Sequence, residues 1–464
     1  MSEPSAQNRL VSLDVFRGMT IAGMVLVNNP GTWSSIYGPL KHAEWHGITP
    51  TDYVFPFFLF IVGVAIPIAL GRRIEAGVTR DVYFKIFSRA ATIFIVSLIM
   101  SALPFFNFAE TQVPYVIKIL IVLGYTAALF LYLWDKAKLA LIVAAATAAV
   151  VTGFWAAGYL VVPYDLGQMR IMGVLQRIAI CYLIVAVLFL HTNWKQQAMI
   201  GGGLLLLYWF VMTTISVPGC EITTINDKAC NLAAYLDRLI LTENHIWRGG
   251  KVFDPEGILS TIPAIVTTIS GVLAGTWLTS AAKSSPPYEG GVAAASADGV
   301  VLSSSTQAET AGRSKYEIVS GLFFFGVVLL AAGWSWSLIF PLNKSLWTSS
   351  YVLYTSGLAL CFLGFCYWLI DIQGYKRWAK PFVIFGVNAL ALYVFSGIMA
   401  RLLGMVHVSG PEGKDISLQG WIFDTFFLSV ATPINASLAY AVCFILFWLF
   451  LMWLLYRRRI YIKV

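Results

Sequence analysis

Charged residues are scarce in this chain. Lys, Arg, Asp and Glu make up 12% of its 464 residues, whereas 58% are hydrophobic and 15% are aromatic. Soluble globular domains carry about 25% charged residues, so this composition excludes an ordinary soluble fold. Apolar runs of roughly 17 to 25 residues, the length of a helix that crosses a bilayer, recur along the sequence. We therefore predict an all-α polytopic membrane protein.

Cysteine and histidine are also rare, with six and five residues respectively. Four cysteines lie in apolar runs, and Cys220 and Cys230 share one polar segment, where either a short-loop disulfide or two free thiols would fit. His42 and His46 have the i, i+4 spacing of a metal pair, but the glycine and proline that follow leave little helix to present both rings. No cysteine or carboxylate set completes a ligand group, so we expect no metal.

The apolar runs define about twelve predicted transmembrane helices. They lie near residues 13–32, 50–70, 84–103, 113–133, 137–161, 172–191, 198–217, 257–280, 316–338, 347–370, 381–403 and 434–456. Residues 281–315 are rich in Ala, Ser and Gly, which predicts a disordered cytoplasmic linker. The chain thus divides into a first membrane part, residues 1–280, and a second, residues 316–464.

Basic residues explain the formal net charge of +8 and predict the orientation. They gather after the second span, after the tenth and at the C-terminus, whereas residues 104–112 have none. Because Lys and Arg mark cytoplasmic loops, both termini are predicted in the cytoplasm of a bacterial inner (plasma) membrane. The loop 218–256, here called the outer loop, then faces the periplasm. Topology accounts for the charge, so we do not expect nucleic-acid binding.

The segment between the first two spans contains the polar and ionisable residues that are best suited to catalysis. The first apolar core, Met19–Val27, is too short to cross a bilayer alone. Asn28, Asn29 and Pro30 end it, and such broken, polar backbone is tolerated at membrane depth only where it is buried in protein or lines a wet cavity. We predict a cavity near Asn28, followed by a hinge, residues 28–52, that leads to the second span. Charges in the first run also argue against a cleavable signal peptide.

Sequence motifs follow one another in a fixed order along most of the chain. Around the hinge they are L-D-V-F-R-G from Leu13, K-H-A-E-W-H-G from Lys41 and D-Y-V-F-P-F-F-L-F-I from Asp52. Further along they are R-I-M-G-V-L-Q-R from Arg170, V-P-G-C from Val217, D-P-E-G-I-L from Asp254, P-L-N-K-S-L-W from Pro341 and F-G-V-N from Phe385. With this ordered set the chain resembles the heparan-alpha-glucosaminide N-acetyltransferase family of transmembrane acyltransferases.

The resemblance implies a transmembrane acyltransferase fold, acetyl-CoA as cosubstrate, an amine acceptor and a homodimer. Residues 113–161 look like an added hairpin of two spans. Because two spans are an even number, the hairpin leaves the orientation of the later spans unchanged.

Three residues of the hinge are predicted to be catalytic. His42 falls on the family's catalytic histidine, and an imidazole that titrates near neutral pH can take a proton from an attacking amine. By position alone it would be an ordinary solvated loop residue. Asn28 matches the family's preceding asparagine and can stabilise an oxyanion, although Asn also often ends helices. Asp52 can orient His42 or place negative charge in the first turn of the second span.

Five residues are candidates for coenzyme binding, and each has a structural alternative. Arg17 can pair with Asp14 along one helix, and Arg72 and Arg73 can serve only the topology. A polar side chain inside a span usually faces the bundle interior. The full set is Arg17, Arg72, Arg73, Arg177 and Asn388.

Four residues on the predicted outer side are candidates for contact with the acceptor: Glu256, Asn343, Lys344 and Trp347. An ordinary interfacial loop explains them equally well.

The sequence thus favours a transmembrane enzyme that moves an acetyl group from cytoplasmic acetyl-CoA to an amino group, most simply that of an amino sugar such as terminal glucosamine. Direct transfer in a ternary complex and an acetyl-His42 intermediate are both open, as is O-acetylation. The alternative is a membrane transporter whose path is lined by Asn28, His42 and Arg177. A weaker rival is a scaffold or sensor that binds a partner through the outer loop.

Overall fold

The structure, a computed structural model, describes residues 10–75, 77–280, 313–410 and 415–462. Most of the predicted linker, residues 281–315, lies outside the described residues. Eleven helices of the described part are long and apolar enough to cross a membrane. They are α1 (Val11–Asn28), α2 (Val54–Glu75), α3 (Arg80–Ala102), α4 (Tyr115–Leu133), α5 (Ala137–Ala156), α6 (Val174–His191), α7 (Trp194–Thr214), α9 (Thr261–Thr279), α10 (Lys315–Ser337), α11 (Ser349–Cys366) and α15 (Pro433–Arg457). The predicted all-α polytopic membrane fold is confirmed.

A twelfth candidate span is broken. Helices α12 (Lys380–Val387) and α13 (Ala389–Met405) meet at an angle of 81° on either side of Asn388. The span predicted near residues 381–403 corresponds to this bent pair of helices, and the sequence did not predict the break. The buried side chain of Asn388 donates to Ile460 O at 3.1 Å and accepts from Ile462 N at 2.8 Å, so it holds the C-terminal segment at the break.

The remaining elements are short. They are α8 (Leu232–Leu241), α14 (Leu418–Ile422), the strands β1 (His407–Ser409) and β2 (Asp415–Ser417), the 3₁₀ turns η2 (Gly38–Leu40), η3 (Pro50–Tyr53) and η4 (Leu166–Gln168), and the π-helical turns η6 (Tyr367–Ile372) and η8 (Phe423–Leu428). The two strands pair in antiparallel fashion, with His407 opposite Ser417.

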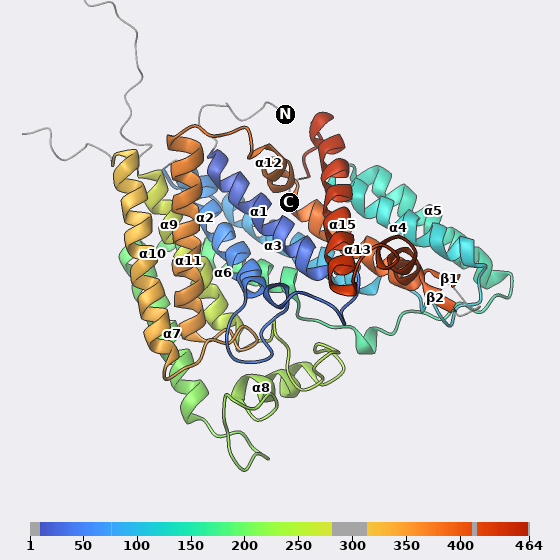
Figure 1. Ribbon diagram of the computed structural model, residues 1–464, viewed down its shortest axis with the longest axis horizontal. Coiled ribbons are helices and arrows are strands. Elements are labelled where there is room, and N and C mark those ends of the chain that lie inside the picture. The colour runs from blue at the N-terminus through green and yellow to red at the C-terminus, as the bar shows by residue number, and fades with distance from the viewer. Residues whose placement is uncertain (1–9, 76, 281–312, 411–414, 463–464) are drawn as a thin grey trace, which may run out of the picture.

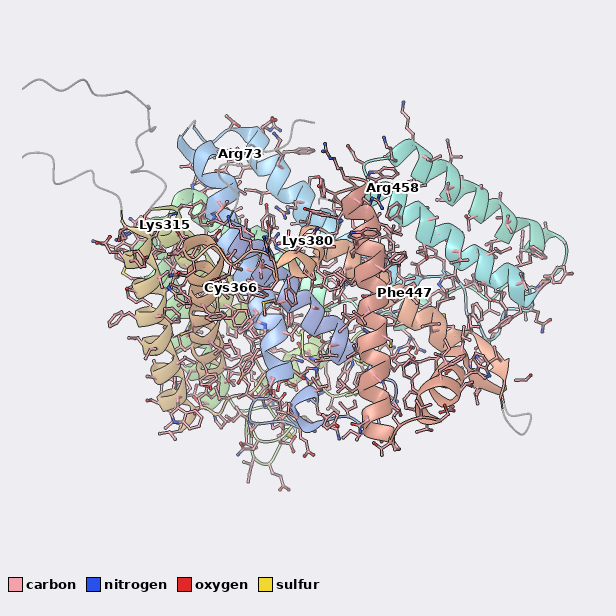
Figure 2. All side chains as sticks on the ribbon, turned by 45° about the horizontal axis from the view of Figure 1, so that its top comes forward. Arg73, Lys315, Cys366, Lys380, Phe447 and Arg458 are labelled. Carbon is pink, nitrogen blue, oxygen red and sulfur yellow. A yellow bond between two sulfur atoms is a disulfide. The ribbon has the colours of Figure 1, made fainter. Side chains whose placement is uncertain are left out.

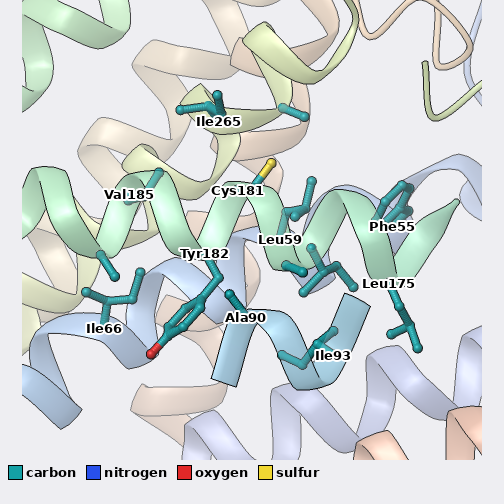
Figure 3. Packing of buried hydrophobic residues seen from close by; sticks show 14 of the residues in the cluster. Phe55, Leu59, Ile66, Ala90, Ile93, Leu175, Cys181, Tyr182, Val185 and Ile265 are labelled. Atoms are coloured by element: carbon teal, nitrogen blue, oxygen red, sulfur yellow. The ribbon is translucent and has the colours of Figure 1, made fainter. Parts of the chain in front are cut away.

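The largest buried cluster is built around α6, whose apolar residues pack against α2, α3 and α9 (Figure 3). Close helix contact depends on glycine. A Cβ on Gly63 of α2 would lie 2.0 Å from Thr268 O, and one on Gly271 of α9 would lie 2.0 Å from Phe60 O. These two glycines let the backbones of α2 and α9 touch, which is the usual way that membrane helices pack tightly.

The helices form an elongated bundle with two different ends (Figure 1). The α4–α5 hairpin lies at one edge, and α7, α9, α10 and α11 lie at the other. Helix α8 and the loop that follows α1 are at the end drawn lowest. Arg73, Lys315, Lys380 and Arg458 lie toward the opposite end (Figure 2). This separation matches the charge pattern, and the assignment of cytoplasmic and outer sides stays a prediction.

Candidate functional site

The hinge holds a histidine against a buried carboxylate. His42 Nδ1 lies 2.6 Å from Asp52 Oδ1, with 47% of the His42 side chain exposed and 1% of that of Asp52. The other oxygen, Oδ2, accepts hydrogen bonds from Ala43 N at 3.1 Å, Thr49 N at 2.9 Å and Thr49 Oγ1 at 3.0 Å. Asp52 is therefore fixed by these donors, and its Oδ1 can accept a hydrogen bond from the Nδ1–H tautomer of His42.

This carboxylate sits at the start of the second span for a local reason. Thr49 and Asp52 form a capping box around the turn η3, in which each side chain bonds the other residue's backbone. Tyr351 of α11 adds a hydrogen bond from its hydroxyl to Asp52 O at 2.6 Å. Asp52 is therefore positioned both by its own turn and by a helix that is almost 300 residues further along the chain.

The segment Pro341–Thr348, here called the 341–348 turn, docks on the hinge. Gly47 N donates to Leu342 O at 2.9 Å, and Asn343 Nδ2 lies 3.3 Å from His46 Nδ1. Asn343 is fully buried, and its Oδ1 accepts from Leu346 N at 2.8 Å, so its amide shapes the turn. In this conformation Asn343 is not available to an acceptor.

Lys344, on the same turn, lies beside the imidazole. Its Nζ is 3.2 Å from both His42 Nδ1 and His42 Nε2. Burial lowers the pKa of Lys344, although the carboxylates of Glu256 and Asp52 act in the opposite direction. The Lys344 side chain is thus held next to the imidazole of His42.

Trp347 anchors the 341–348 turn in the core. It is fully buried, has φ +52°, and donates from its indole N–H to Thr267 Oγ1 at 3.1 Å. The Arg177 guanidinium carbon lies 5.2 Å from the centre of its ring, within the range of a cation–π contact. Trp347 therefore supports the turn and is not exposed to a substrate.

A second charged group lies at the ends of α6 and the outer loop. Arg170 Nε and Nη2 contact Asp254 at 2.9 and 2.5 Å, and Nη2 also contacts Glu256 Oε2 at 2.5 Å. Burial by itself would raise the pKa of Glu256, but Arg170, Arg177 and Lys344 hold it below its usual value. Glu256 is therefore charged, and it extends this ion-pair group toward Lys344.

The guanidinium of Arg177 is fully buried beside that group. Its Nη2 donates to Gly257 O at 3.0 Å and to Ser260 Oγ, whereas Nε and Nη1 have no hydrogen-bond partner within the described ranges. Arg177 thus connects the loop at residues 254–260 with Trp347. This placement gives it a structural role, and a contact with coenzyme stays a prediction.

Helix α8 fixes the outer loop through one acid. Asp237 accepts from Ile258 N at 2.9 Å and from Asp254 N at 3.2 Å. Burial raises the pKa of Asp237 to about 6. The side chain of Asp237 therefore links α8 to the segment that contains Asp254 and Glu256.

A disulfide joins Cys220 and Cys230, which decides between the two alternatives that the sequence left open. The loop that it closes contacts the hinge, because Trp45 Nε1 donates to Ile225 O at 2.9 Å and His46 Nε2 lies 2.9 Å from Asn226 Oδ1. Burial lowers the pKa of His46. No cluster of three or more potential metal ligands occurs in the part of the chain that the structure describes.

Other predicted site residues lie apart from this group. Asn28 is exposed at the C-terminal end of α1, and no hydrogen bond joins it to His42 or Asp52 within the described residues. A small, mainly apolar pocket nearby is lined by Leu26, Val27, Pro30, Ile36, Tyr37, Leu40 and four residues of α15, Ile434, Ser437, Leu438 and Ala441. The lining includes Val27 and Pro30, which flank the Asn28–Asn29 pair, but neither Asn28 nor His42.

The predicted coenzyme residues are spread over several elements. Arg17 lies 3.5 Å from Asp14 on α1, as the helical spacing suggested, and Arg73 lies near the end of α2. The side chain of Arg72 lies outside the described residues. Arg17, Arg73, Arg177 and Asn388 thus lie on different helices or helix junctions of the described structure.

Sequence reasoning missed the roles of Arg170, Asp254 and Asp237. The first two stood in quoted motifs, and a signal was present, because opposite charges at the outer ends of two neighbouring spans favour an ion pair. Asp237 lies on α8, a short helix within the outer loop, and nothing in the sequence indicates its partners, Asp254 N and Ile258 N.

Comparisons with known proteins show which sequences this chain is similar to. The family model described as "Heparan-alpha-glucosaminide N-acetyltransferase, catalytic" matches residues 9–172, which include His42 and Asp52. The chain is 25% identical over 435 residues to heparan-alpha-glucosaminide N-acetyltransferase of Mus musculus, covering 84% of this chain and 53% of the relative. It is 24% identical over 432 residues to the Homo sapiens protein of that name, with 83% and 52% covered.

The resemblance seen in the motifs is thereby confirmed over most of the chain. The chain spans about half the length of these curated relatives.

Proposed function

We propose that this chain is a transmembrane acetyltransferase that moves the acetyl group of acetyl-CoA to an amino group, such as that of a terminal glucosamine, on the outer side of the membrane. The contact of 2.6 Å between His42 Nδ1 and Asp52 Oδ1 carries the proposal, because it gives a half-exposed histidine a buried orienting carboxylate. The similarity to two N-acetyltransferases supports the type of chemistry.

The site favours general-base chemistry. Asp52 keeps the proton of His42 on Nδ1, and Nε2 takes the proton of the acceptor amine as the amine attacks the thioester carbonyl. Asp52 also stabilises the imidazolium that forms, and His42 then passes the proton to the departing sulfur. We propose direct attack in a ternary complex, since the route through acetyl-His42 would require two separate transfers at one ring nitrogen.

The two ends of the helix bundle suit different substrates, acetyl-CoA at one end and the acceptor at the other. We propose that acetyl-CoA reaches the site from the basic end of the bundle, where Arg73 and other Lys and Arg residues can attract its phosphates. Arg17 and Arg72 stay candidates for the same contact. The acceptor would enter at the opposite end, at Glu256, Lys344 and the hinge. We also propose a bacterial inner membrane location, cytoplasmic termini and a homodimer.

The experiment is acetyl transfer by purified protein in nanodiscs, with acetyl-CoA, a panel of amino sugars and mass-spectrometric detection of acetylated products. We expect His42→Ala to abolish product formation and thiol release. His407→Ala is the matched control, because that histidine is exposed on β1 and its ring bonds the backbone of Met405, away from the hinge. A protein that carries sugars across proteoliposomes without consuming acetyl-CoA would instead be a transporter.

A further inference from the structure

The site contains a cation for which general-base chemistry alone gives no role. Lys344 Nζ lies 3.2 Å from His42 Nε2, the atom that would meet the acceptor amine. Asn28, the residue that the sequence suggested as oxyanion donor, has no hydrogen bond to the hinge histidine within the described part of the chain. A negative charge that forms beside Nε2 therefore has one nearby donor with a formal positive charge.

We propose that Lys344 is a catalytic residue, whose ammonium donates a hydrogen bond to the thioester carbonyl oxygen as that oxygen becomes negative. The proposal rests on the proposed acetyl transfer and adds a third residue, after His42 and Asp52, to its chemistry. A preorganised donor at a developing oxyanion is worth about 100-fold to 1,000-fold in rate.

The surroundings of Lys344 suit this role. Three ionisable groups besides His42 act on Lys344. They are the carboxylates of Asp52 on η3 and of Glu256 at the end of the outer loop, and the guanidinium of Arg177 on α6. The carboxylates favour the charged lysine, and burial with Arg177 opposes it. On balance burial prevails and the pKa of Lys344 lies below its usual value, while Glu256 and Asp52 keep negative charge close to the ammonium.

The 341–348 turn also fixes where Lys344 is. Asn343 caps the turn from inside, and Trp347 is locked between Arg177 and Phe55, whose ring centroid lies 5.0 Å away. A lysine on a rigid turn loses less freedom when it binds than one on a flexible loop, which is the condition for a preorganised donor.

The reaction balances as follows. The amine nitrogen forms a bond to the carbonyl carbon while its proton moves to His42 Nε2, and the carbonyl oxygen takes the electron pair and a hydrogen bond from Lys344 Nζ. When the carbonyl re-forms, the carbon–sulfur bond breaks, its electron pair leaves with the sulfur, and His42 returns the proton to give CoA thiol. Lys344 ends unchanged. Before the amine arrives, Nζ contacts Nε2, and the incoming amine displaces it toward the carbonyl.

An acceptor-binding role for Lys344 makes a different kinetic prediction. If the lysine only bound acceptor hydroxyls, its loss would raise the KM for the acceptor and leave kcat nearly intact. If it stabilises the oxyanion, kcat falls and both KM values stay close to those of the wild type.

The experiment compares wild type, Lys344→Met, Lys344→Arg and the control Lys251→Met, which removes an exposed lysine from the outer loop. Steady-state kinetics are measured with acetyl-CoA and the best amine acceptor, in nanodiscs. We expect kcat of Lys344→Met to fall about 100-fold to 1,000-fold with each KM within about twofold, and Lys251→Met to match the wild type. Normal kcat with a raised acceptor KM, or no change, would overturn the proposal.

The pH–rate profile tests the same role if Lys344→Met does not fold. The wild-type rate should fall at high pH as Lys344 loses its proton, because burial lowers the pKa of this lysine. In Lys344→Arg that basic limb should vanish, since a guanidinium stays charged. An unchanged basic limb in Lys344→Arg would refute the proposed role of Lys344 but not the proposed acetyl transfer. A wild-type protein without any acetyl transfer would overturn both this inference and the proposed function.

Discussion

Asp52→Asn is the substitution that most directly tests the geometry of the site. Asp52 Oδ2 receives three hydrogen bonds from Ala43 and Thr49, two of them from backbone N–H groups that cannot turn away. An asparagine at this position must therefore keep its oxygen toward those donors. Its NH₂ group then faces His42 Nδ1, so Nδ1 has to accept a hydrogen bond.

The magnitude follows from the tautomer. With Nδ1 as acceptor, the proton of the neutral imidazole moves to Nε2, which can no longer take a proton from the amine. A wrong histidine tautomer with intact geometry costs about 10⁴-fold in kcat in catalytic triads, which corresponds to about 5 kcal/mol of transition-state stabilisation. The variant is isosteric and retains the capping interaction of Thr49, so we expect it to fold.

The assay is acetyl transfer under saturating acetyl-CoA, with thermal unfolding as the check on folding. Glu44→Gln is the matched control, because it changes an exposed acid of the same hinge into its amide. We expect the control to retain wild-type kcat. A folded Asp52→Asn protein that loses less than about tenfold in kcat would show that Asp52 does not set the tautomer of His42.

Three further predictions concern stability, each measured by thermal unfolding in nanodiscs. Gly63→Ala places a Cβ 2.0 Å from Thr268 O, so we expect a loss of about 1–3 kcal/mol; Gly71→Ala, where nothing lies within 4 Å, should be close to neutral. Asn388→Ala removes two hydrogen bonds to Ile460 and Ile462, for about 2 kcal/mol, and should expose the C-terminal segment to proteases; unchanged proteolysis would contradict this. Arg170→Met leaves the buried carboxylates of Asp254 and Glu256 without their partner, for about 3–5 kcal/mol, and a stable variant would refute that pairing.

The number and order of the membrane helices followed from the sequence, because span length and apolar composition are set by the bilayer. The break at Asn388 did not. One asparagine in an apolar run predicts a polar contact, but only the structure shows that the contact is with the backbone at Ile460 and Ile462 and that the helix turns by 81° there. A partner from a segment more than 70 residues away leaves no local signal.

The candidate site divides in the same way. His42 and Asp52 are ten residues apart, and the Thr49 cap makes their meeting a local event that the sequence could suggest. The contact of Lys344 with His42 spans 302 residues, and the pairing of Arg170 with Asp254 spans 84. Such contacts depend on how helices pack, which a single sequence does not specify.

The long-range contacts also explain how the two membrane parts build one site. The first part supplies His42 and Asp52, which are joined by a local turn, and the second supplies Lys344 and Tyr351, which lie on either side of Trp347. Tyr351 bonds the backbone of Asp52 and Lys344 contacts the imidazole of His42, so both contacts depend on how α11 and the turn before it pack against the hinge. The contact between His42 and Asp52 can form within one short segment. The contact between Lys344 and His42 forms only when the two membrane parts pack together. Proper packing of the second membrane part is therefore the step that completes the site.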